Sequence, residues 1–123
     1  MFRDVGWGRR HPNDIKAAFA RSSIKAFAFG GNELIGFGRT IDDGKYYATL
    51  VDLVVCPARQ RQGVGRAILQ DLHSQLDGYL IATLTAAPEV QGFYRKMGWR
   101  NQSTSMIRPR SKEQERLNCP EAV

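Results

Sequence analysis

The chain has 123 residues, which is enough for one domain and little more. A hydrophobic content of 42% and an aromatic content of 10% are typical of a globular protein and exclude a wholly disordered chain. No apolar run approaches the roughly 18 residues that a membrane-spanning helix requires. The N-terminal residues show no apolar h-region, so we expect neither a membrane segment nor a secretory signal.

The formal net charge of +6 indicates an anionic partner, which would be nucleic acid, a membrane surface or a phosphorylated cofactor. Half of this charge falls in residues 59–100, where six basic and three acidic residues give +3. The basic residues of that segment form two compact groups beside glycines. A nucleic-acid interface usually spreads Lys and Arg along one element, so compact groups favour local phosphate sites. The groups are Arg59, Arg61 and Arg66, then Arg95, Lys96 and Arg100.

The two cysteines, Cys56 and Cys119, have no second cysteine or histidine at metal-ligand spacing. We therefore expect reduced thiols, no metal site and a cytoplasmic protein. The lack of a nearby histidine also argues against a thiol nucleophile.

The first half of the chain predicts one helix followed by three strands. The helix starts after Pro12, with Asn13 or Asp14 as its cap. Strands over 24–29 and 33–41 are separated by a Gly-Gly-Asn turn. The next strand, over 46–56, is long, β-branched and apolar without clean alternation. We expect it to be a central strand buried on both faces.

The second half predicts a helix over 64–76, a strand over 79–86, a helix over 88–97 that ends at Gly98, and a last strand over 99–107. This order of elements indicates an α/β fold with a sheet of mixed direction.

The most informative segment is the basic loop between the predicted central strand and the helix at 64–76. Its glycines, Gly63 and Gly65, fall at the start of that helix. A helix N-terminus offers unpaired N–H groups and partial positive charge, and glycine lets a ligand approach the backbone closely. The loop is neither a Walker A sequence nor a dinucleotide fingerprint. Taken alone, the two glycines leave open that they serve only a tight helix start.

Several motifs together resemble the GNAT superfamily of acetyl-CoA-dependent N-acetyltransferases. The pattern Q-x-x-G-x-G at residues 60–65 follows V-x-P at 55–57, and F-Y-R-K-M-G-W stands at 93–99. The sequence G-F-G-R at 36–39 before D-L-V-V at 52–55 is similar to the small bacterial and plastid-type members. Some of those members acetylate arylalkylamines or protein amines.

The resemblance implies a mixed, mostly antiparallel central sheet, flanked by helices and splayed at the acetyl-CoA site. We expect one domain over residues 1–108, with a short N-terminal part that lacks an obvious first strand, and a polar, poorly ordered tail over 109–123. Substrate-binding elements usually lie in the N-terminal part of the family fold. The substrate site would therefore be open, or completed by a second subunit in a homodimer.

The same resemblance implies roles for single residues. The Leu53 amide would donate to the thioester carbonyl as an oxyanion donor, and Tyr94 would protonate the departing thiolate. The pattern of residues alone leaves open that Tyr94 is a core aromatic on an amphipathic helix. The cofactor-binding residues implied by the family are Leu53, Val54, Val55, Gln60, Arg61, Gln62, Gly63, Val64, Gly65, Arg66, Phe93 and Lys96.

Transfer of an acetyl group to an amine also needs a base that removes the amine proton. Asp52 is our candidate because it is the only carboxylate within the central strand, and a buried charge needs a partner or a task. The alternative is a structural hydrogen-bonding group, since Asp52 and Leu53 point to opposite faces unless a bulge intervenes. The aromatic residues that could line an amine pocket, or equally pack in the core, are Trp7, Phe37, Tyr46 and Tyr47.

The sequence thus predicts a cytoplasmic enzyme that moves acetyl from acetyl-CoA directly to a primary amine through a ternary complex. Direct transfer is preferred because neither cysteine has a partner base. The alternative is a small basic module that binds nucleic acid, or an acyl-CoA without turnover.

Overall fold

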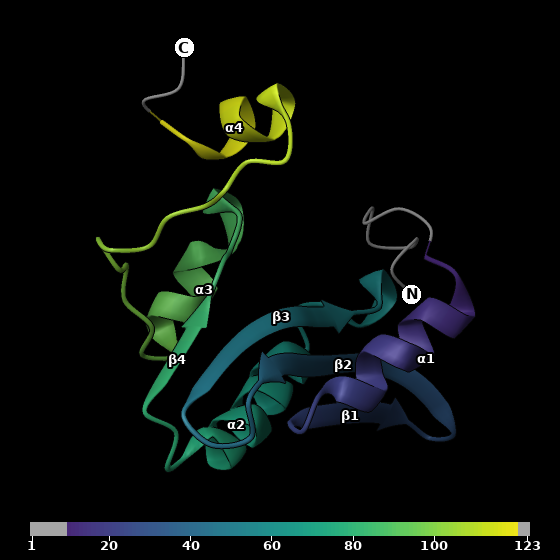
Figure 1. The fold of residues 1–123 in the computed structure, drawn as a ribbon. Helices are drawn as coiled ribbons and strands as arrows, with labels where there is room; N and C mark the ends of the chain where they lie inside the picture. The colour runs from purple at the N-terminus through teal and green to yellow at the C-terminus, as the bar shows by residue number, and fades with distance from the viewer. Residues whose placement is uncertain (1–9, 121–123) are drawn as a thin grey trace. The chain divides into compact units, whose positions relative to one another are not determined.

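A computed structural model describes residues 10–120 of the chain (Figure 1). The chain divides into two compact units, Met1–Gln91 and Gly92–Val123, and each is considered by itself. Within residues 10–120, none of the helices is long and apolar enough to cross a membrane. The single domain predicted over residues 1–108 stays a prediction.

The first unit contains a four-stranded sheet in the order β1-β2-β3-β4. The pairs β1–β2 and β2–β3 are antiparallel, and β3–β4 is parallel. This arrangement confirms the predicted mixed, mostly antiparallel sheet. Each of the first four predicted strands is present, although the fourth is shorter than expected. The bounds are β1 Lys25–Gly30, β2 Glu33–Asp42, β3 Tyr47–Val55 and β4 Ile81–Leu84.

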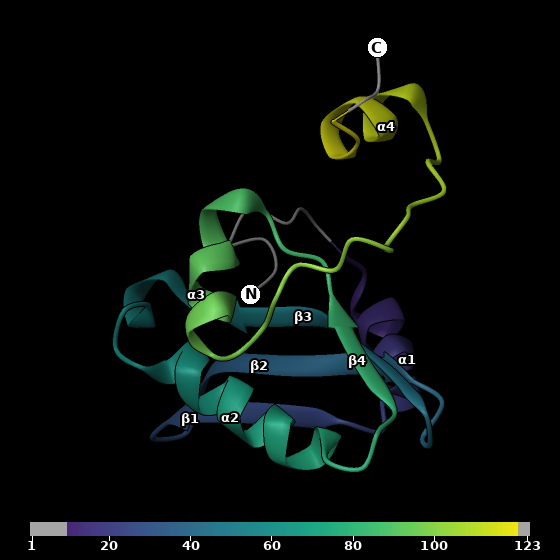
Figure 2. The same cartoon turned by 90° about the vertical axis from the view of Figure 1, so that its left-hand side faces the viewer.

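Two helices cover opposite faces of this sheet, as Figures 1 and 2 show for α1 (Pro12–Arg21) and α2 (Val64–Leu76). Helix α1 packs Phe19 edge-to-face on Phe37 of β2, with 5.3 Å between ring centroids. On the other face, the completely buried Leu69 and Leu72 of α2 lie against the sheet. The α2 helix has the predicted bounds.

The start of α1 differs from the prediction. The cap is His11, whose Nδ1 accepts a hydrogen bond from the Asn13 N–H at 3.1 Å. The predicted caps, Asn13 and Asp14, are already inside the helix. The reason is Pro12, whose fixed φ suits the first helical position.

The burial of β3 also differs from the prediction of a strand buried on both faces. Ala48 and Leu50 are buried in its first half, and Asp52 and Val54 in its second half, while the residues between them are partly exposed. Only the first half of β3 has a strand on both edges, because β4 pairs with Tyr47–Leu50 alone.

The predicted helix over 88–97 is divided into a 3-10 turn at Pro88–Val90 and helix α3 at Gln91–Lys96. Gly98 follows with φ of +101°, as expected for a glycine that ends a helix. The predicted strand over 99–107 is wrong, because this segment contains no strand. Its middle, residues 100–105, consists of polar side chains that have no apolar face to bury.

The tail holds a helix that the sequence did not predict, α4 at Lys112–Asn118. Ser111 caps this helix, because its Oγ accepts a hydrogen bond from the Gln114 N–H at 3.0 Å. The expectation of a poorly ordered tail over 109–123 stays a prediction.

Candidate functional site

The candidate site lies where β4 leaves β3. The two strands pair only over Tyr47–Leu50 and Ile81–Leu84, and β4 then turns away from β3 (Figure 1). Strand β3 continues to Val55, paired with β2 on its other edge. The predicted splay of the sheet is thus confirmed, and it opens beside residues 51–55 of β3.

A β-bulge lies in β3 at the start of this opening. Thr40 of β2 stands opposite Leu50, but the next residue, Arg39, stands opposite Asp52. Val51 is therefore an extra residue without a partner of its own in β2. A bulge of this kind shifts the alternation of the strand by one residue.

The hydrogen-bond pattern shows which backbone groups face the opening. The Cys56 N–H donates to the carbonyl of Ile35 in β2 at 2.8 Å. In an antiparallel pair, every second residue turns its backbone N–H and C=O toward the same neighbour. Counting back from Cys56 in steps of two, Val54 and Asp52 also turn their backbone groups toward β2. Leu53 and Val55 lie between these positions. Their backbone groups point away from β2, toward the side that β4 has left.

The bulge is what directs Leu53 in this way. At the start of β3, the Asp43 N–H donates to the Tyr47 carbonyl at 3.1 Å, so Tyr47 and every second residue after it face β2. A regular strand would continue this alternation and turn Leu53 toward β2 as well. The extra residue, Val51, reverses the alternation and leaves the Leu53 N–H directed into the opening.

The loop after β3 is stabilised by its own glutamines. Gln60 Nε2 donates to the Val55 carbonyl at 3.0 Å, and Gln62 Nε2 donates to the Ala58 carbonyl at 3.3 Å. Between them, Arg61 adopts a positive φ of 63°, which a non-glycine residue rarely does. The predicted phosphate loop is therefore a compact turn whose backbone is held in an uncommon conformation.

The loop ends at Gly63, the N-cap of α2, with φ of +85°. The first hydrogen bond of the helix runs from the Ala67 N–H to the Gly63 carbonyl at 3.1 Å, so the N–H groups of residues 64–66 precede the intrahelical ladder. This first turn carries no acidic side chain, and among the described residues no atom lies within 4 Å of a β-carbon built at Gly63. The helix end can therefore accept a phosphate.

Asp52 lies on the opposite face of β3 from Leu53, because the bulge precedes both residues. Its side chain is 4% exposed, and its Oδ2 accepts a hydrogen bond from Arg39 Nε at 2.7 Å. Arg10 Nη1 lies 3.6 Å from Asp52 Oδ1. The Asp52 carboxylate is thus an ion-pair partner, which fits the alternative that Asp52 is a structural hydrogen-bonding group. The same carboxylate also lines a pocket.

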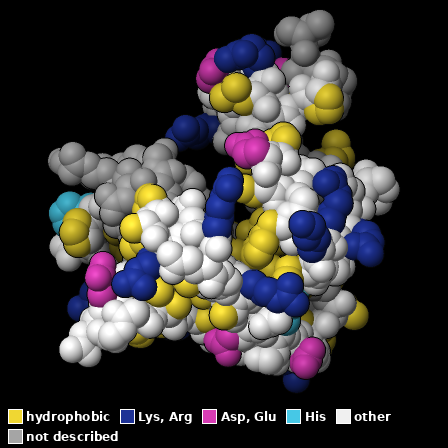
Figure 3. Space-filling view, turned by 180° about the vertical axis from the view of Figure 1, so that it is seen from behind, with side chains coloured by type: hydrophobic (Ala, Val, Ile, Leu, Met, Phe, Trp, Pro, Cys, Tyr) yellow, Lys and Arg dark blue, Asp and Glu magenta, His cyan; other side chains and the backbone are white. Residues whose placement is uncertain are grey.

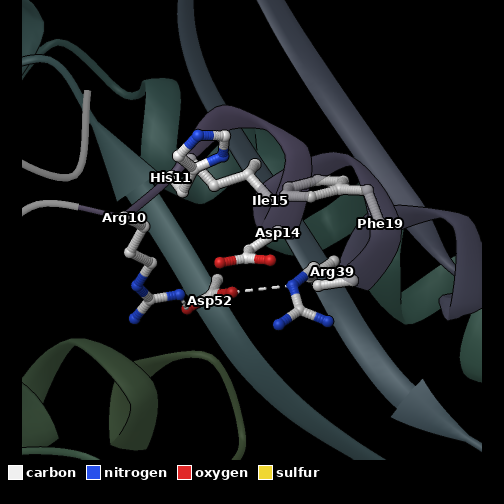
Figure 4. A pocket seen from close by; sticks show the side chains of 8 residues that line it. Arg10, His11, Asp14, Ile15, Phe19, Arg39 and Asp52 are labelled. Atoms are coloured by element: carbon white, nitrogen blue, oxygen red, sulfur yellow. Dashed lines mark hydrogen bonds and ion pairs between the residues drawn. The ribbon is translucent and has the colours of Figure 1, made fainter.

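This pocket has a volume of about 300 Å³ and lies between α1 and the sheet (Figure 4). Asp14 and Phe19 of α1 line it together with Arg10, Arg39 and Asp52. Two carboxylates and two guanidinium groups therefore face one another beside an aromatic ring. Sequence reasoning missed Arg10 and Asp14, and it had no signal that would bring them to Asp52.

The aromatic residues considered for an amine pocket are distributed differently. Phe37 is 5% exposed and belongs to the core, where it packs with Val54. Tyr46 and Tyr47 are exposed on the surface and do not line the pocket. Trp7 lies outside the described residues.

In the second unit, Tyr94 lies on α3 between two aromatic rings. Its ring is edge-on to Phe93 at 5.1 Å and to Trp99 at 6.3 Å between centroids. Burial raises the pKa of Tyr94 above its usual value of 10.0. The hydroxyl therefore stays protonated at neutral pH, as a proton donor must. Lys96, another predicted cofactor contact, is exposed on the same helix.

Comparison with known proteins defines the class of this chain. The family described as acetyltransferase (GNAT) domain matches residues 11–110. The uncharacterized N-acetyltransferase ycf52 of Porphyra purpurea is 37% identical over 101 residues, which cover 77% of this chain and 58% of the relative. Serotonin N-acetyltransferase 2, chloroplastic, of Oryza sativa subsp. japonica is 30% identical over 105 residues, covering 80% of this chain and 52% of the relative.

The structural comparison agrees. A GNAT-family acetyltransferase from Streptococcus pneumoniae TIGR4 superposes with a TM-score of 0.74 at 24% identity, covering 89% of this chain and 86% of that one, so the two share a fold. The chain belongs to the GNAT acetyltransferase family. It spans little more than half the length of these two curated relatives, 58% and 52%.

Proposed function

We propose that this chain is an N-acetyltransferase that moves acetyl from acetyl-CoA directly to a primary amine. The observation that carries the proposal is the direction of the Leu53 N–H. It faces the opening between β3 and β4, and the same strand leads through the loop into a helix N-terminus that can accept a phosphate. An oxyanion donor and a phosphate site on one continuous segment are what a coenzyme A thioester requires.

Coenzyme A would bind along this segment. The backbone amides of residues 61–66 would receive the pyrophosphate, with the Arg61 and Arg66 side chains adding positive charge. The pantetheine arm would lie beside residues 53–55 and hydrogen-bond to the backbone groups that β4 does not use. Gln60 supports the site indirectly, because its side chain fixes the loop to Val55. Phe93 and Lys96 remain proposed contacts from α3.

The chemistry follows from these groups. The amine nitrogen attacks the thioester carbonyl carbon, and the Leu53 N–H stabilises the negative charge that develops on the carbonyl oxygen. The C–S bond then breaks, and the Tyr94 hydroxyl protonates the thiolate. Asp52 accepts the proton that the amine loses, directly or through a water molecule. The products are an N-acetylated amine and free coenzyme A.

The amine would enter through the pocket between α1 and the sheet. Figure 4 shows the carboxylates of Asp14 and Asp52 directed into this pocket. The carboxylates of Asp14 and Asp52 offer hydrogen-bond acceptors for the N–H groups of an amine, and Asp52 is the chain neighbour of Leu53. The pocket would thus bring the acceptor to the strand position where the thioester carbonyl binds.

The charge and the thiols fit this function. Figure 3 shows Lys and Arg side chains at the surface, and the net charge of +6 fits a protein that binds a phosphorylated ligand. Cys56 and Cys119 are free, which fits a reducing compartment such as the cytoplasm. A homodimer stays a prediction.

The test is calorimetry with acetyl-CoA, followed by an assay of coenzyme A release with arylalkylamines, polyamines and peptide N-termini. We expect saturable binding of acetyl-CoA and release with at least one amine class. Failure to bind acetyl-CoA at millimolar concentration would overturn the proposal. Tight binding to duplex DNA with a steep salt dependence would support a nucleic-acid module. Binding of acetyl-CoA without release across the amine panel would support a module without turnover.

A further inference from the structure

A buried ion pair joins the two strands at the bulge. Arg39 and Asp52 stand directly opposite each other in β2 and β3, immediately after the extra residue Val51. The distance from Arg39 Nε to Asp52 Oδ2 is 2.7 Å, and the two side chains are 11% and 4% exposed. A charge-assisted hydrogen bond of this length away from water is among the stronger polar contacts in a protein.

The Arg39 guanidinium is also connected, through the Ser22 hydroxyl, to Thr40 on the other side of the bulge. Arg39 Nη1 donates to Ser22 Oγ at 3.2 Å, and the Ser22 hydroxyl in turn donates to the Thr40 carbonyl. Thr40 pairs with Leu50, the residue of β3 that immediately precedes the extra residue Val51. The aromatic ring of Phe19 lies 5.4 Å from Arg39 Cζ and packs against the guanidinium.

These contacts have a consequence for the backbone of β3. A bulge interrupts the ladder of backbone hydrogen bonds, so the ladder itself does not determine where the extra residue lies. A slip of one residue would turn the Leu53 N–H toward β2, away from the opening. The observed Arg39–Asp52 hydrogen bond joins two residues that stand directly opposite each other, so a slipped register would have to stretch or break it. It therefore selects the register in which Leu53 faces the opening.

We propose that Arg39 is a positioning residue that acts through Asp52: it holds the bulge that directs the Leu53 N–H toward the thioester carbonyl. This role rests on the proposed function, and it requires no contact between Arg39 and acetyl-CoA.

The experiment compares the affinities for acetyl-CoA and for coenzyme A, two ligands that differ by the acetyl group alone. Their ratio therefore reports the hydrogen bond from Leu53 to the acetyl carbonyl, whether or not the protein turns over. We expect the wild type to prefer acetyl-CoA by roughly three- to tenfold. In Arg39→Gln this preference should fall to about one, with the coenzyme A affinity kept within about twofold. Arg39→Lys should give an intermediate preference.

Turnover provides a second readout. In Arg39→Gln, kcat should fall by roughly 10- to 100-fold, while KM for acetyl-CoA changes much less, because the lost contact matters most in the transition state.

Two further variants keep the test decisive. Removing Arg39 alone leaves a buried carboxylate unpaired, which can unfold the protein. The double variant Arg39→Met, Asp52→Leu removes both charges at similar volume, and it should lose the same preference for acetyl-CoA while keeping the native circular dichroism. The control is Arg116→Gln, which breaks the ion pair to Glu113, also 2.7 Å long but exposed. This control should keep the wild-type ratio of affinities.

An unchanged ratio in Arg39→Gln and in the double variant would overturn the positioning role. An equal loss of affinity for both ligands in a folded variant would also overturn it, since that result indicates a general structural effect. A wild-type protein that binds neither ligand would overturn the proposed function and the positioning role together. That failure is distinguishable because it appears before any substitution is made.

Discussion

Gly38 of β2 and Leu72 of α2 approach so closely that a β-carbon built on Gly38 would lie 2.7 Å from Leu72 Cδ1. At Gly36, a built β-carbon would lie 2.9 Å from both Ile68 Cδ1 and the backbone carbonyl of Val54. The helix therefore rests on a strip of the sheet that has no side chains. This close approach fixes the position of α2, and with it the N-terminus that we propose as the phosphate site.

Substitution of these glycines should destabilise the fold to different extents. Gly36→Ala should lower the free energy of unfolding by about 2 to 3 kcal/mol, because the new methyl group meets a backbone carbonyl that cannot move alone. Gly38→Ala should cost about 1 to 2 kcal/mol, because the atoms it meets are ends of side chains. Urea denaturation followed by circular dichroism measures both values.

Gly92→Ala is the matched control, because a β-carbon built there would meet no described atom within 4 Å apart from its chain neighbours and the backbone of its own helix. Gly92 lies within helix α3, so alanine should leave stability unchanged or raise it by up to about 1 kcal/mol. If Gly36→Ala behaves like Gly92→Ala, the close packing of α2 on β2 is wrong.

The two ends of α2 allow a test of the phosphate site. Gly63 and Gly78 flank the helix with φ of +85° and +90°, and a β-carbon at either position would meet no described atom within 4 Å. Alanine should therefore cost a similar amount of stability at both, about 1 kcal/mol of backbone strain. Only Gly63→Ala should weaken coenzyme A binding, by at least about tenfold, because its methyl group would stand where the pyrophosphate approaches.

Calorimetry with coenzyme A and with pantetheine, which lacks the pyrophosphate, checks this expectation. Both variants should bind pantetheine as the wild type does. Equal coenzyme A affinities in Gly63→Ala and Gly78→Ala would rule out the loop as the pyrophosphate site.

Much of the fold was predictable because it depends on local patterns. The turns at glycines, the apolar strands and the two glycines at the start of α2 each leave a signal within a few neighbouring residues. The bulge at Val51 leaves no such signal, since it exists only as a mismatch between two paired strands. The contact between Arg39 and Asp52 likewise depends on that register. The sequence could therefore identify Asp52 as unusual but could not supply its partner.

The failed prediction of a strand over 99–107 has a related cause. Trp99, Met106 and Ile107 are apolar residues that favour a strand, but the segment between them is polar. In the structure, Met106 is 95% exposed and Ile107 is 45% exposed. Strand formation needs a partner and a face to bury, and local composition does not show whether either exists.

Tyr94→Phe tests the proton donor. Removing the hydroxyl should lower kcat by roughly 100-fold or more while leaving the affinity for acetyl-CoA unchanged, since the proton is needed only when the thiolate leaves. Because burial raises the pKa of Tyr94 above its ordinary value of 10.0, the hydroxyl is protonated throughout the neutral pH range. The ratio of wild-type to variant kcat should therefore be constant around neutral pH and fall only in strongly alkaline solution, at a higher pH than for an ordinary tyrosine. Steady-state kinetics across pH measures this ratio.

The control is Tyr79→Phe, which removes a tyrosine hydroxyl from a structural contact. Tyr79 Oη donates to Asp42 Oδ2 at 3.1 Å, so this variant should lose stability and keep its kcat. A kcat for Tyr94→Phe equal to that of the wild type would remove Tyr94 from the mechanism.

Asp42, at the end of β2, accepts hydrogen bonds from several partners and should make stability depend on pH. The Ser23 and Thr40 hydroxyls donate to its carboxylate at 2.5 and 2.8 Å, and the Gly44 N–H donates at 2.9 Å. Partial burial raises the pKa of Asp42, but the hydrogen bonds from Ser23, Thr40 and Tyr79 outweigh it, so the pKa lies below the ordinary value of 3.8. The folded state therefore favours the ionised carboxylate.

The sign of the effect follows from this lowered pKa. The unfolded chain takes up a proton at Asp42 before the folded chain does, so the stabilisation is complete above pH 3.8 and is lost as the pH falls through the folded-state pKa. Asp42→Asn should lower the free energy of unfolding by about 1 to 2 kcal/mol at neutral pH, and the difference from the wild type should shrink in acid. Asp77→Asn, at an exposed carboxylate, should show no such difference. Urea denaturation at a series of pH values measures both variants. A difference for Asp42→Asn that stays constant into acid would show that its carboxylate is not held ionised by these hydrogen bonds.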